Sequence, residues 1–272
     1  MSVINTNVKS LVAQQALTIN NRSMSKAMEQ LSTGKRINSA ADDAAGLAIA
    51  NKMTAQVRGL NQAVRNANDA ISMIQTVEGA TNEVTNMLQR MRELAVQSVN
   101  GTNTDADRTA LDSEFGELQA EITRIAENTE WNGTDVGNAS AAFAFQVGAN
   151  SGQTITVTFK DIDGMSGVTS AISAGVDTVT GATAAITAVD NALSAIDAYR
   201  GDLGAKINRL TYAADNLTNV STNTAASRSR IQDADYAKAT TELARAQIIQ
   251  QAATAMLAQA NQQPQSVLSL LQ

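Results

Sequence analysis

The sequence lacks cysteine and histidine altogether, and its 272 residues include a single proline, one tryptophan, three tyrosines and four phenylalanines. Without cysteine there is no disulfide framework, and zinc or copper sites lose their usual ligands. Nucleophilic catalysis loses both the thiol and the imidazole that would activate a serine. An enzyme would have to work with carboxylates, lysine, arginine, tyrosine and hydroxyl groups alone. We therefore expect no catalytic activity, no cofactor and no metal site.

Charge and hydropathy exclude further classes of protein. The chain carries 20 Lys and Arg residues against 26 Asp and Glu residues, and a net charge of -6 disfavours a partner that presents many phosphates. The chain has no run of 18 or more apolar residues, and Met1–Asn5 do not form a basic segment followed by an apolar one. We expect neither nucleic acid nor membrane as a partner, and no cleaved signal peptide.

The strongest positive signal is a heptad spacing of apolar residues, at alternating steps of three and four. It predicts one helix over about residues 44–99, with Asp42 or Asp43 at its first turn and the segment 100–104 ending it. At 1.5 Å per residue such a helix is about 85 Å long, which indicates an elongated protein. The residues on this spacing are Met53, Val57, Leu60, Val64, Ala67, Ile71 and Ile74, then Val84, Leu88, Met91 and Ala95.

Three more elements follow along the chain. A second helix is predicted over about 104–128, antiparallel to the first. Alternating apolar residues on both sides of a turn-rich segment predict a β-hairpin over about 141–160. A third long helix is predicted over about 180–228, because apolar residues again recur at steps of three and four. They are Ile186, Val189, Leu193, Ile196, Leu203, Ile207, Leu210, Ala214 and Leu217. The fold class is therefore mainly α, an elongated antiparallel helical bundle or coiled coil with a small hairpin region.

The two ends of the chain are also predicted to be helical, but they carry too little apolar surface for a core of their own. Ordering each residue costs free energy that burial must offset, so we expect these ends to fold against partners. The apolar residues that we expect to pack in this way are Ile4, Val8, Leu11, Leu31, Leu243, Ile249, Leu257, Leu268 and Leu271.

Three segments closely resemble the conserved ends of bacterial flagellins. They are LSTGKRINSAADDAAGLAI at 31–49, SRIQDADYA at 229–237 and MLAQANQQPQSVLSLL at 256–271. The resemblance implies an inner domain in which the N- and C-terminal helices of residues 1–43 and 230–272 pair as a coiled coil. It also implies a rod domain over 44–229. Only about twenty residues separate Lys160 from Thr180, so the variable outer domains of many flagellins are expected to be absent.

The resemblance also implies a function and a set of partners. A flagellin polymerises with itself into the extracellular flagellar filament, the propeller for swimming. Its subunits are exported unfolded by a type III apparatus with the help of a chaperone. They assemble at the distal tip, where the cap and hook-associated proteins are further partners. A repeated interface whose rotation does not close produces such a helical polymer.

A further family feature concerns innate immunity. The segment 89–97 resembles the part of flagellin that Toll-like receptor five recognises. This resemblance implies that Gln89, Arg90 and Leu94, together with Glu114 on the second helix, contact that receptor. Another interpretation of Arg90 is a solvated or ion-paired surface residue.

Two other functions remain open at this point. The junction protein between hook and filament shares distant end signatures, although the near-complete match at both ends favours the filament subunit. A soluble helical binding module is the alternative from another class, but it would not need two underpacked apolar ends. Asp42, Asp43, Asp233 and Asp235 are interpreted as residues at helix starts and interfaces, not as metal ligands. Asn132-Gly133-Thr134 matches a glycosylation pattern that is short enough to arise by chance.

Overall fold

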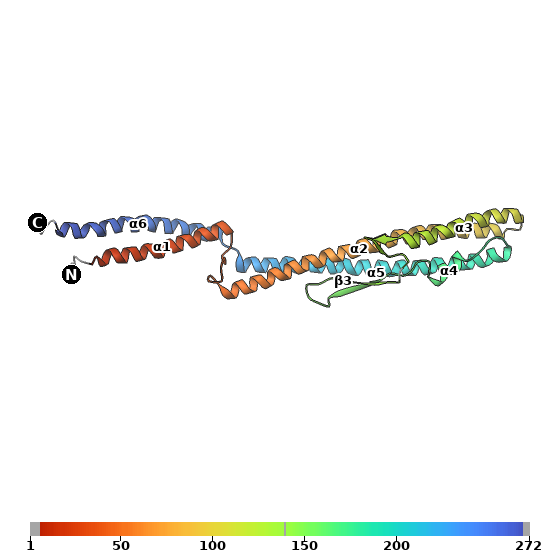
Figure 1. Cartoon of the computed structure of the whole chain (residues 1–272), viewed down its shortest axis with the longest axis horizontal. Coiled ribbons are helices and arrows are strands. Elements are labelled where there is room, and N and C mark those ends of the chain that lie inside the picture. Colours follow the sequence, from red (N-terminus) through yellow and green to blue (C-terminus); the bar gives the residue numbers. More distant parts are fainter. Residues whose placement is uncertain (1–5, 139, 269–272) are drawn as a thin grey trace. The chain divides into compact units, whose positions relative to one another are not determined.

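A computed structural model describes residues 6–138 and 140–268, except for the side chains of residues 263–268. Within these ranges the chain forms six helices and two small antiparallel sheets (Figure 1). This confirms the predicted fold class of a mainly helical protein with a small hairpin region. The elements are α1 (Val8–Thr33), α2 (Ala44–Val99), α3 (Asp105–Asn128), β1 (Glu130–Trp131), β2 (Thr134–Asp135), β3 (Ala142–Gln146), β4 (Thr154–Thr158), α4 (Ser166–Ile172), α5 (Val179–Gln232) and α6 (Tyr236–Leu268).

The chain divides into two compact units. The terminal unit comprises Met1–Val57 and Asn223–Gln272, and the middle unit comprises Arg58–Thr222. The long helices α2 and α5 each contribute one part to each unit, so the unit boundaries lie inside helices.

The middle unit contains two apolar cores. One joins α2, α3, α4 and α5 through fully buried side chains such as Leu88, Phe115 and Ile196. The other joins α2 and α5 to the hairpin β3–β4 and contains Val157, Phe159 and Tyr199. These residues lie on the apolar side that the spacing of threes and fours generates, and alternate residues of β4 point into the core.

Polar contacts fix the ends of the middle helices. Thr104 and Asp107 form a capping box at the start of α3, which satisfies free N–H groups of its first turn. The buried guanidinium of Arg108 donates hydrogen bonds to the carbonyl oxygens of Asn103 and Asn100, at 3.4 and 3.3 Å. A positive charge therefore lies against the loop that follows the C-terminus of α2, where the helix dipole favours it.

Two small elements differ from the sequence expectations. The strands β1 and β2 pair across Asn132-Gly133, and both residues have positive φ angles of 49° and 73°. Such a two-residue turn favours Asn-Gly because each of its central residues must adopt that conformation. The segment between Lys160 and Thr180 was expected to be only a linker. It contains α4, whose Val168 and Ala171 are buried in the first core.

One stretch of α5 is long and apolar enough to cross a membrane, judged by length and composition alone. Its large apolar residues, among them Val189, Ile196 and Leu203, are instead buried inside the middle unit. Helix α5 therefore buries one side in the middle unit, and 28% of the apolar stretch is buried.

Candidate functional site

Helices α1 and α6 of the terminal unit pair antiparallel along their lengths (Figure 1). Polar side chains contact the partner helix near the middle of the pair and at the start of α1. The Asn20 Nδ2 donates to the carbonyl oxygen of Ala246 at 2.8 Å, and the Asn7 Nδ2 donates to that of Ala260 at 2.8 Å. From one contact to the other the residue number rises on α1 and falls on α6, so the two helices are antiparallel.

The line along which α1 and α6 touch, called the seam here, alternates small residues with larger half-buried ones such as Leu31, Leu243 and Leu257. On α6 an alanine recurs at every seventh position, and these alanines are the buried or half-buried ones. On α1 only Asn20 and Ala27 are buried. Small side chains let two helices approach closely, so an asparagine amide of one helix can reach the backbone of the other. The four seam alanines of α6 are Ala239, Ala246, Ala253 and Ala260.

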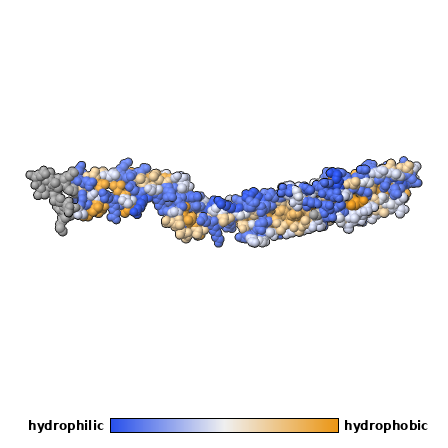
Figure 2. All heavy atoms as spheres, viewed as in Figure 1, coloured by the Kyte–Doolittle hydropathy of each residue, from blue (hydrophilic) through white to orange (hydrophobic). Residues whose placement is uncertain are grey.

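A second set of apolar residues on the pair is exposed, and we call it the apolar face. Figure 2 shows hydrophobic residues gathered over this part of the molecule among hydrophilic ones. Between α1 and α6 lies a mainly apolar hollow of about 420 Å³, lined by Val8, Val12 and Met256 among others. A side chain such as Leu11, 55% exposed, contributes almost nothing to the stability of the pair alone. The apolar face consists of Val8, Leu11, Val12 and Ile19 on α1 and of Ile248, Ile249 and Met256 on α6.

The nine end residues named from the sequence fall into different places. Val8, Leu11 and Ile249 are exposed on the apolar face, whereas Leu31, Leu243 and Leu257 are half-buried. Leu268 ends α6, and its side chain lies outside the description. Ile4 and Leu271 lie outside the described residues.

The connections α1–α2 and α5–α6 meet at a joint formed by residues 34–36 and 232–234. Lys35 and Asp233 pair as an isolated antiparallel bridge. The Arg36 N–H donates to the Gln232 carbonyl oxygen at 2.7 Å, and the Ala234 N–H donates to the Gly34 carbonyl oxygen at 2.9 Å. Gly34 has a φ of 68° and ends α1 in the left-handed conformation that suits glycine. The joint thus connects residues 31–49 with residues 229–237, two of the three segments that resemble the conserved flagellin ends.

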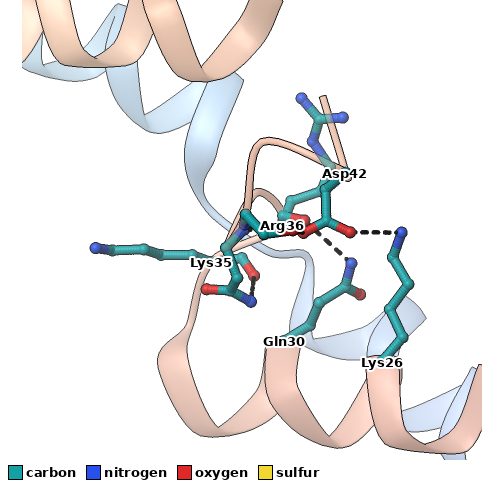
Figure 3. A network of polar contacts seen from close by, with 7 residues as sticks. Lys26, Gln30, Lys35, Arg36 and Asp42 are labelled. Atoms are coloured by element: carbon teal, nitrogen blue, oxygen red, sulfur yellow. Dashed lines mark hydrogen bonds and ion pairs between the residues drawn. The ribbon is translucent and has the colours of Figure 1, made fainter. Parts of the chain in front are cut away.

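Side chains tie the α1–α2 connection to α1, as Figure 3 shows. Lys26 forms an ion pair with Asp42 at 2.8 Å, and Gln30 donates from Nε2 to the carbonyl oxygen of Arg36 at 3.2 Å. Asp42 also accepts hydrogen bonds from the N–H groups of Ser39 and Asn38. Lys26 first, and then these N–H groups, lower the pKa of the Asp42 carboxyl far below its usual value. The ionised form therefore stabilises this connection above the usual pKa, and that contribution is lost as the pH falls towards the lowered value.

Two of the four aspartates interpreted as helix-start or interface residues, Asp43 and Asp235, lie at helix starts. Asp43 precedes α2, and its Oδ1 accepts a hydrogen bond from the Gly46 N–H at 2.8 Å. Asp235 precedes α6, and its Oδ1 accepts from the Ala237 N–H at 2.9 Å. Among the residues that the structure describes, no three acidic side chains are grouped in a way that could hold a metal ion.

The four residues named for receptor recognition lie on α2 and α3 of the middle unit. Gln89 and Arg90 are exposed, and Arg90 forms an ion pair with Glu114 of α3 at 2.8 Å and with Glu93 at 3.0 Å. Glu114 first, and then Glu93, raise the pKa of the Arg90 guanidinium. Leu94 is 0% exposed and belongs to the first core. The structure therefore brings Arg90 and Glu114 together and places Leu94 beneath the surface.

Sequence reasoning missed the asparagines of the seam. Asn7 and Asn20 were not among the residues named from the sequence. The available signal was on the other helix, where alanine at every seventh position indicates a close approach that an amide can bridge.

Two family models match the chain. Bacterial flagellin N-terminal helical region matches residues 4–140, and bacterial flagellin C-terminal helical region matches residues 186–271. Among curated relatives, Flagellin of Halalkalibacterium halodurans is 49% identical over 271 residues, which cover 99% of each chain. Flagellin A of Vibrio cholerae is 38% identical over an alignment of 375 residues, which also covers 99% of each chain.

Solved structures show the same fold. The crystal structure of Bacillus cereus flagellin superposes with a TM-score of 0.52 at 33% identity, over 60% of this chain and 94% of that one. A putative flagellar hook-associated protein from Vibrio parahaemolyticus superposes with a TM-score of 0.59 over 71% of this chain and all of that one. The latter pair is only 14% identical, so this likeness concerns the fold alone.

Proposed function

Because the chain belongs to the bacterial flagellin family, we propose that the apolar face of α1 and α6 is the surface on which its copies assemble. The protein is a structural subunit of the flagellar filament, an extracellular appendage. The full-length match to a flagellin of nearly equal length identifies it as a short form without the outer domain. That match also favours the filament subunit over the hook–filament junction protein and over a soluble binding module.

The observation that carries the proposal is the exposure of large apolar side chains on helices with little core of their own. Taking each large aliphatic side chain out of water stabilises by about 1.5–3 kcal/mol. Covering the apolar face would thus contribute on the order of 10 kcal/mol per subunit before the cost of ordering. Neighbouring copies of the same chain, related by a rotation that does not close, would supply the cover.

The proposed division of labour follows the family. Residues 1–43 and 230–272 form the inner core domain. Residues 44–229 form the rod domain, supported by the two cores of the middle unit. The subunit has a mechanical role and no catalytic one.

Export and assembly partners belong to the same proposal. The chain leaves the cell unfolded through the type III apparatus, escorted by an export chaperone and without a cleaved signal peptide. It then folds at the filament tip beneath the cap, next to the hook-associated proteins at the filament's ends. Helices that gain most of their burial only on assembly suit this route, because they suppress polymerisation inside the cell.

A charge on the apolar face tests the self-assembly surface. We expect Leu11→Asp to abolish the extension of parent filament seeds, observed by electron microscopy, because the filament would bury the new carboxylate. The soluble variant should keep the circular dichroism and melting temperature of the parent, since Leu11 is exposed in the single chain. Gln14→Asp, at an exposed position of α1 outside the apolar face, is the matched control and should extend seeds normally. Normal extension by Leu11→Asp would refute the surface.

Recognition by Toll-like receptor five is proposed for Gln89, Arg90 and Glu114, with Leu94 acting through its packing under this part of α2. Arg90→Ala should lower receptor signalling at least about ten-fold, as expected for an arginine at the centre of an interface. Arg92→Ala is the matched control, because Arg92 lies on the same helix and loses an ion pair of the same kind, with Asp190 at 2.7 Å. Equal signalling by the parent and Arg90→Ala would reject the assignment without affecting the filament role.

A further inference from the structure

The alanine repeat of the seam does not by itself fix the register of α1 on α6. Ala239, Ala246, Ala253 and Ala260 are spaced by seven residues, so a slip of one heptad replaces each alanine by another. The bridge between Lys35 and Asp233 fixes the register at the joint. At the other end of the pair, a polar residue that is satisfied in one register only can serve the same purpose, as in coiled coils.

The single proline of the chain makes one of these four positions different. In an α-helix the carbonyl oxygen of each residue accepts from the N–H four residues later. Proline has no N–H, and Pro264 lies four residues after Ala260 within α6. The carbonyl of Ala260 therefore lacks its intrahelical donor, whereas those of the other three seam alanines are followed by Leu243, Gln250 and Leu257, which have one.

Asn7 supplies the missing donor from α1. Its Nδ2 lies 2.8 Å from the carbonyl oxygen of Ala260, while its Oδ1 accepts from the Ser10 N–H at 3.1 Å and caps α1. One partner accepts from the amide N–H and the other donates to the amide oxygen, so both functional groups of the side chain are used. Asn20 makes a bond of the same length to Ala246, but that carbonyl also has a backbone donor within its own helix.

We infer that Asn7 is a positioning residue that holds the register of α1 on α6 at the end of the pair opposite the joint, by bonding to the one seam carbonyl that Pro264 leaves free. In a register slipped by one heptad, Asn7 would face Ala253, whose carbonyl already accepts from the Leu257 N–H. The carbonyl of Ala260 would then have no donor in the helix. The register decides which side chains of α1 lie beside Ile248, Ile249 and Met256 on the apolar face. The inference concerns pairing within one subunit and does not rest on the proposed contacts between subunits.

Disulfide trapping tests the inference directly, because the natural chain has no cysteine. Seven residues from the Asn20–Ala246 contact, the native register places Ala13 opposite Ala253, whereas a one-heptad slip places Ala13 opposite Ala246. The pairs A13C/A253C and A13C/A246C therefore report the two registers. Each full-length variant is oxidised both in solution and co-polymerised with an excess of parent subunits. The ratio of the initial rates of intrachain disulfide formation gives the preference for the native register.

The decisive variant is Asn7→Asp, which keeps the Oδ1 cap and loses the Nδ2 donor. It should lower the native-to-slipped ratio about five- to ten-fold, the factor that one net hydrogen bond represents. Pro264→Ala should lower the ratio similarly, because it makes the four alanine carbonyls alike. Asn7→Asp added to Pro264→Ala should then change the ratio less than about two-fold, since the two residues act on one acceptor.

Asn20→Asp is the matched control. It removes a bond of the same kind to a seam alanine, but both registers offer Asn20 an equivalent carbonyl, so the native-to-slipped ratio should stay at the parent value. The inference is overturned if the parent shows no preference in either form or if Asn7→Asp leaves the ratio unchanged. It is also overturned if the Asn7 and Pro264 effects multiply independently. A variant that is not incorporated into polymers is judged by its ratio in solution, so loss of assembly leaves the test intact.

Discussion

The terminal helix pair and the middle unit are built from similar heptad patterns but use them differently. In the middle unit, the apolar positions of α2 are covered by α3, α4, α5 and the hairpin, and side chains such as Leu88 and Phe115 are fully buried. In the terminal pair, alanines fill the seam, while Leu11, Ile248 and other large apolar residues remain exposed. The same periodicity thus gives a self-sufficient core in one region and an unfilled interface in the other.

The difference is one of stability if the proposed assembly surface is correct. A unit that buries its large side chains alone folds without neighbours, whereas the terminal helices would gain much of their apolar burial from other copies. Stability that depends on a partner depends on assembly by mass action.

Removing the C-terminal half of α6 should have the largest effect on this contrast. A chain lacking residues 250–272 loses Met256 and the hollow beside it, and we expect no filament growth from seeds by electron microscopy. The melting transition of the middle unit should remain, because its cores contain no residue beyond 222. Normal filaments from the truncated chain would refute the role given to α6.

Replacing one large apolar side chain by alanine should lower the free energy of unfolding much more in the middle unit than in the terminal pair. Phe115→Ala removes a fully buried ring and should lower the free energy of unfolding by about 3–5 kcal/mol. Leu11→Ala removes an exposed side chain and should change it by less than about 0.5 kcal/mol in the soluble chain. Urea denaturation below the polymerisation threshold measures both variants. Similar losses would mean that α1 is as well packed as the middle unit.

The joint should respond to loss of one carboxylate. Asp42→Asn removes the ion pair with Lys26 and weakens the bonds to Ser39 and Asn38, so the α1–α2 connection should open more often. We expect trypsin to cleave after Lys35 or Arg36 about three- to ten-fold faster, because local opening exposes these sites. Asp69→Asn, on α2 in the middle unit, is the control and should leave this cleavage rate unchanged. Unchanged cleavage in Asp42→Asn would assign the rigidity of the connection to its backbone bridge alone.

Between pH 4 and 7, a pH effect on stability should be small and should come from Asp163 in the middle unit. The hydrogen bond with Asp161, followed by partial burial and the Asp161 charge, raises the pKa of Asp163 from 3.8 to about 6. The folded chain thus binds this proton more tightly than the unfolded chain, and this contribution to stability is lost as the pH rises from about 4 through 6. After allowance for solvent screening, the loss should be about 1 kcal/mol. Asp163→Asn should remove it from urea midpoints between pH 4 and 7, and parallel profiles for parent and variant would contradict the assignment.

The long helices could be predicted because apolar residues at steps of three and four are sufficient to specify them. The hairpin β3–β4 followed in the same way from the alternation around Phe143 and Val157. The turn between β1 and β2 was also encoded, in Asn132-Gly133, but that pair was considered only as part of a glycosylation pattern. Helix α4 was missed because Ser166–Ile172 is short and small residues dominate around it, so its burial against α3 and α5 decides its structure.

The site was predictable to a smaller extent. Apolar residues at both ends indicated a partner-dependent surface, yet the sequence did not show that Leu31 and Leu257 are half-buried while Leu11 faces outward. That distinction depends on which side of α1 meets α6, where Asn7 and Asn20 bond to backbone carbonyls that no side-chain pattern displays. The burial of Leu94 was not expected, because the heptad spacing named for α2 passes from Met91 to Ala95 and the resemblance named Leu94 as a receptor contact.

Hydrogen exchange of the soluble chain and of the filament tests the central claim most directly. The account predicts that amides of α1 and α6 exchange quickly in the soluble chain and become strongly protected in the filament. Amides of α2 around Leu88 and of α5 around Ile196 should be equally protected in both forms. Equal protection of α1 and α6 in the soluble chain and the filament would contradict the account, because the terminal pair would then be stable without its neighbours.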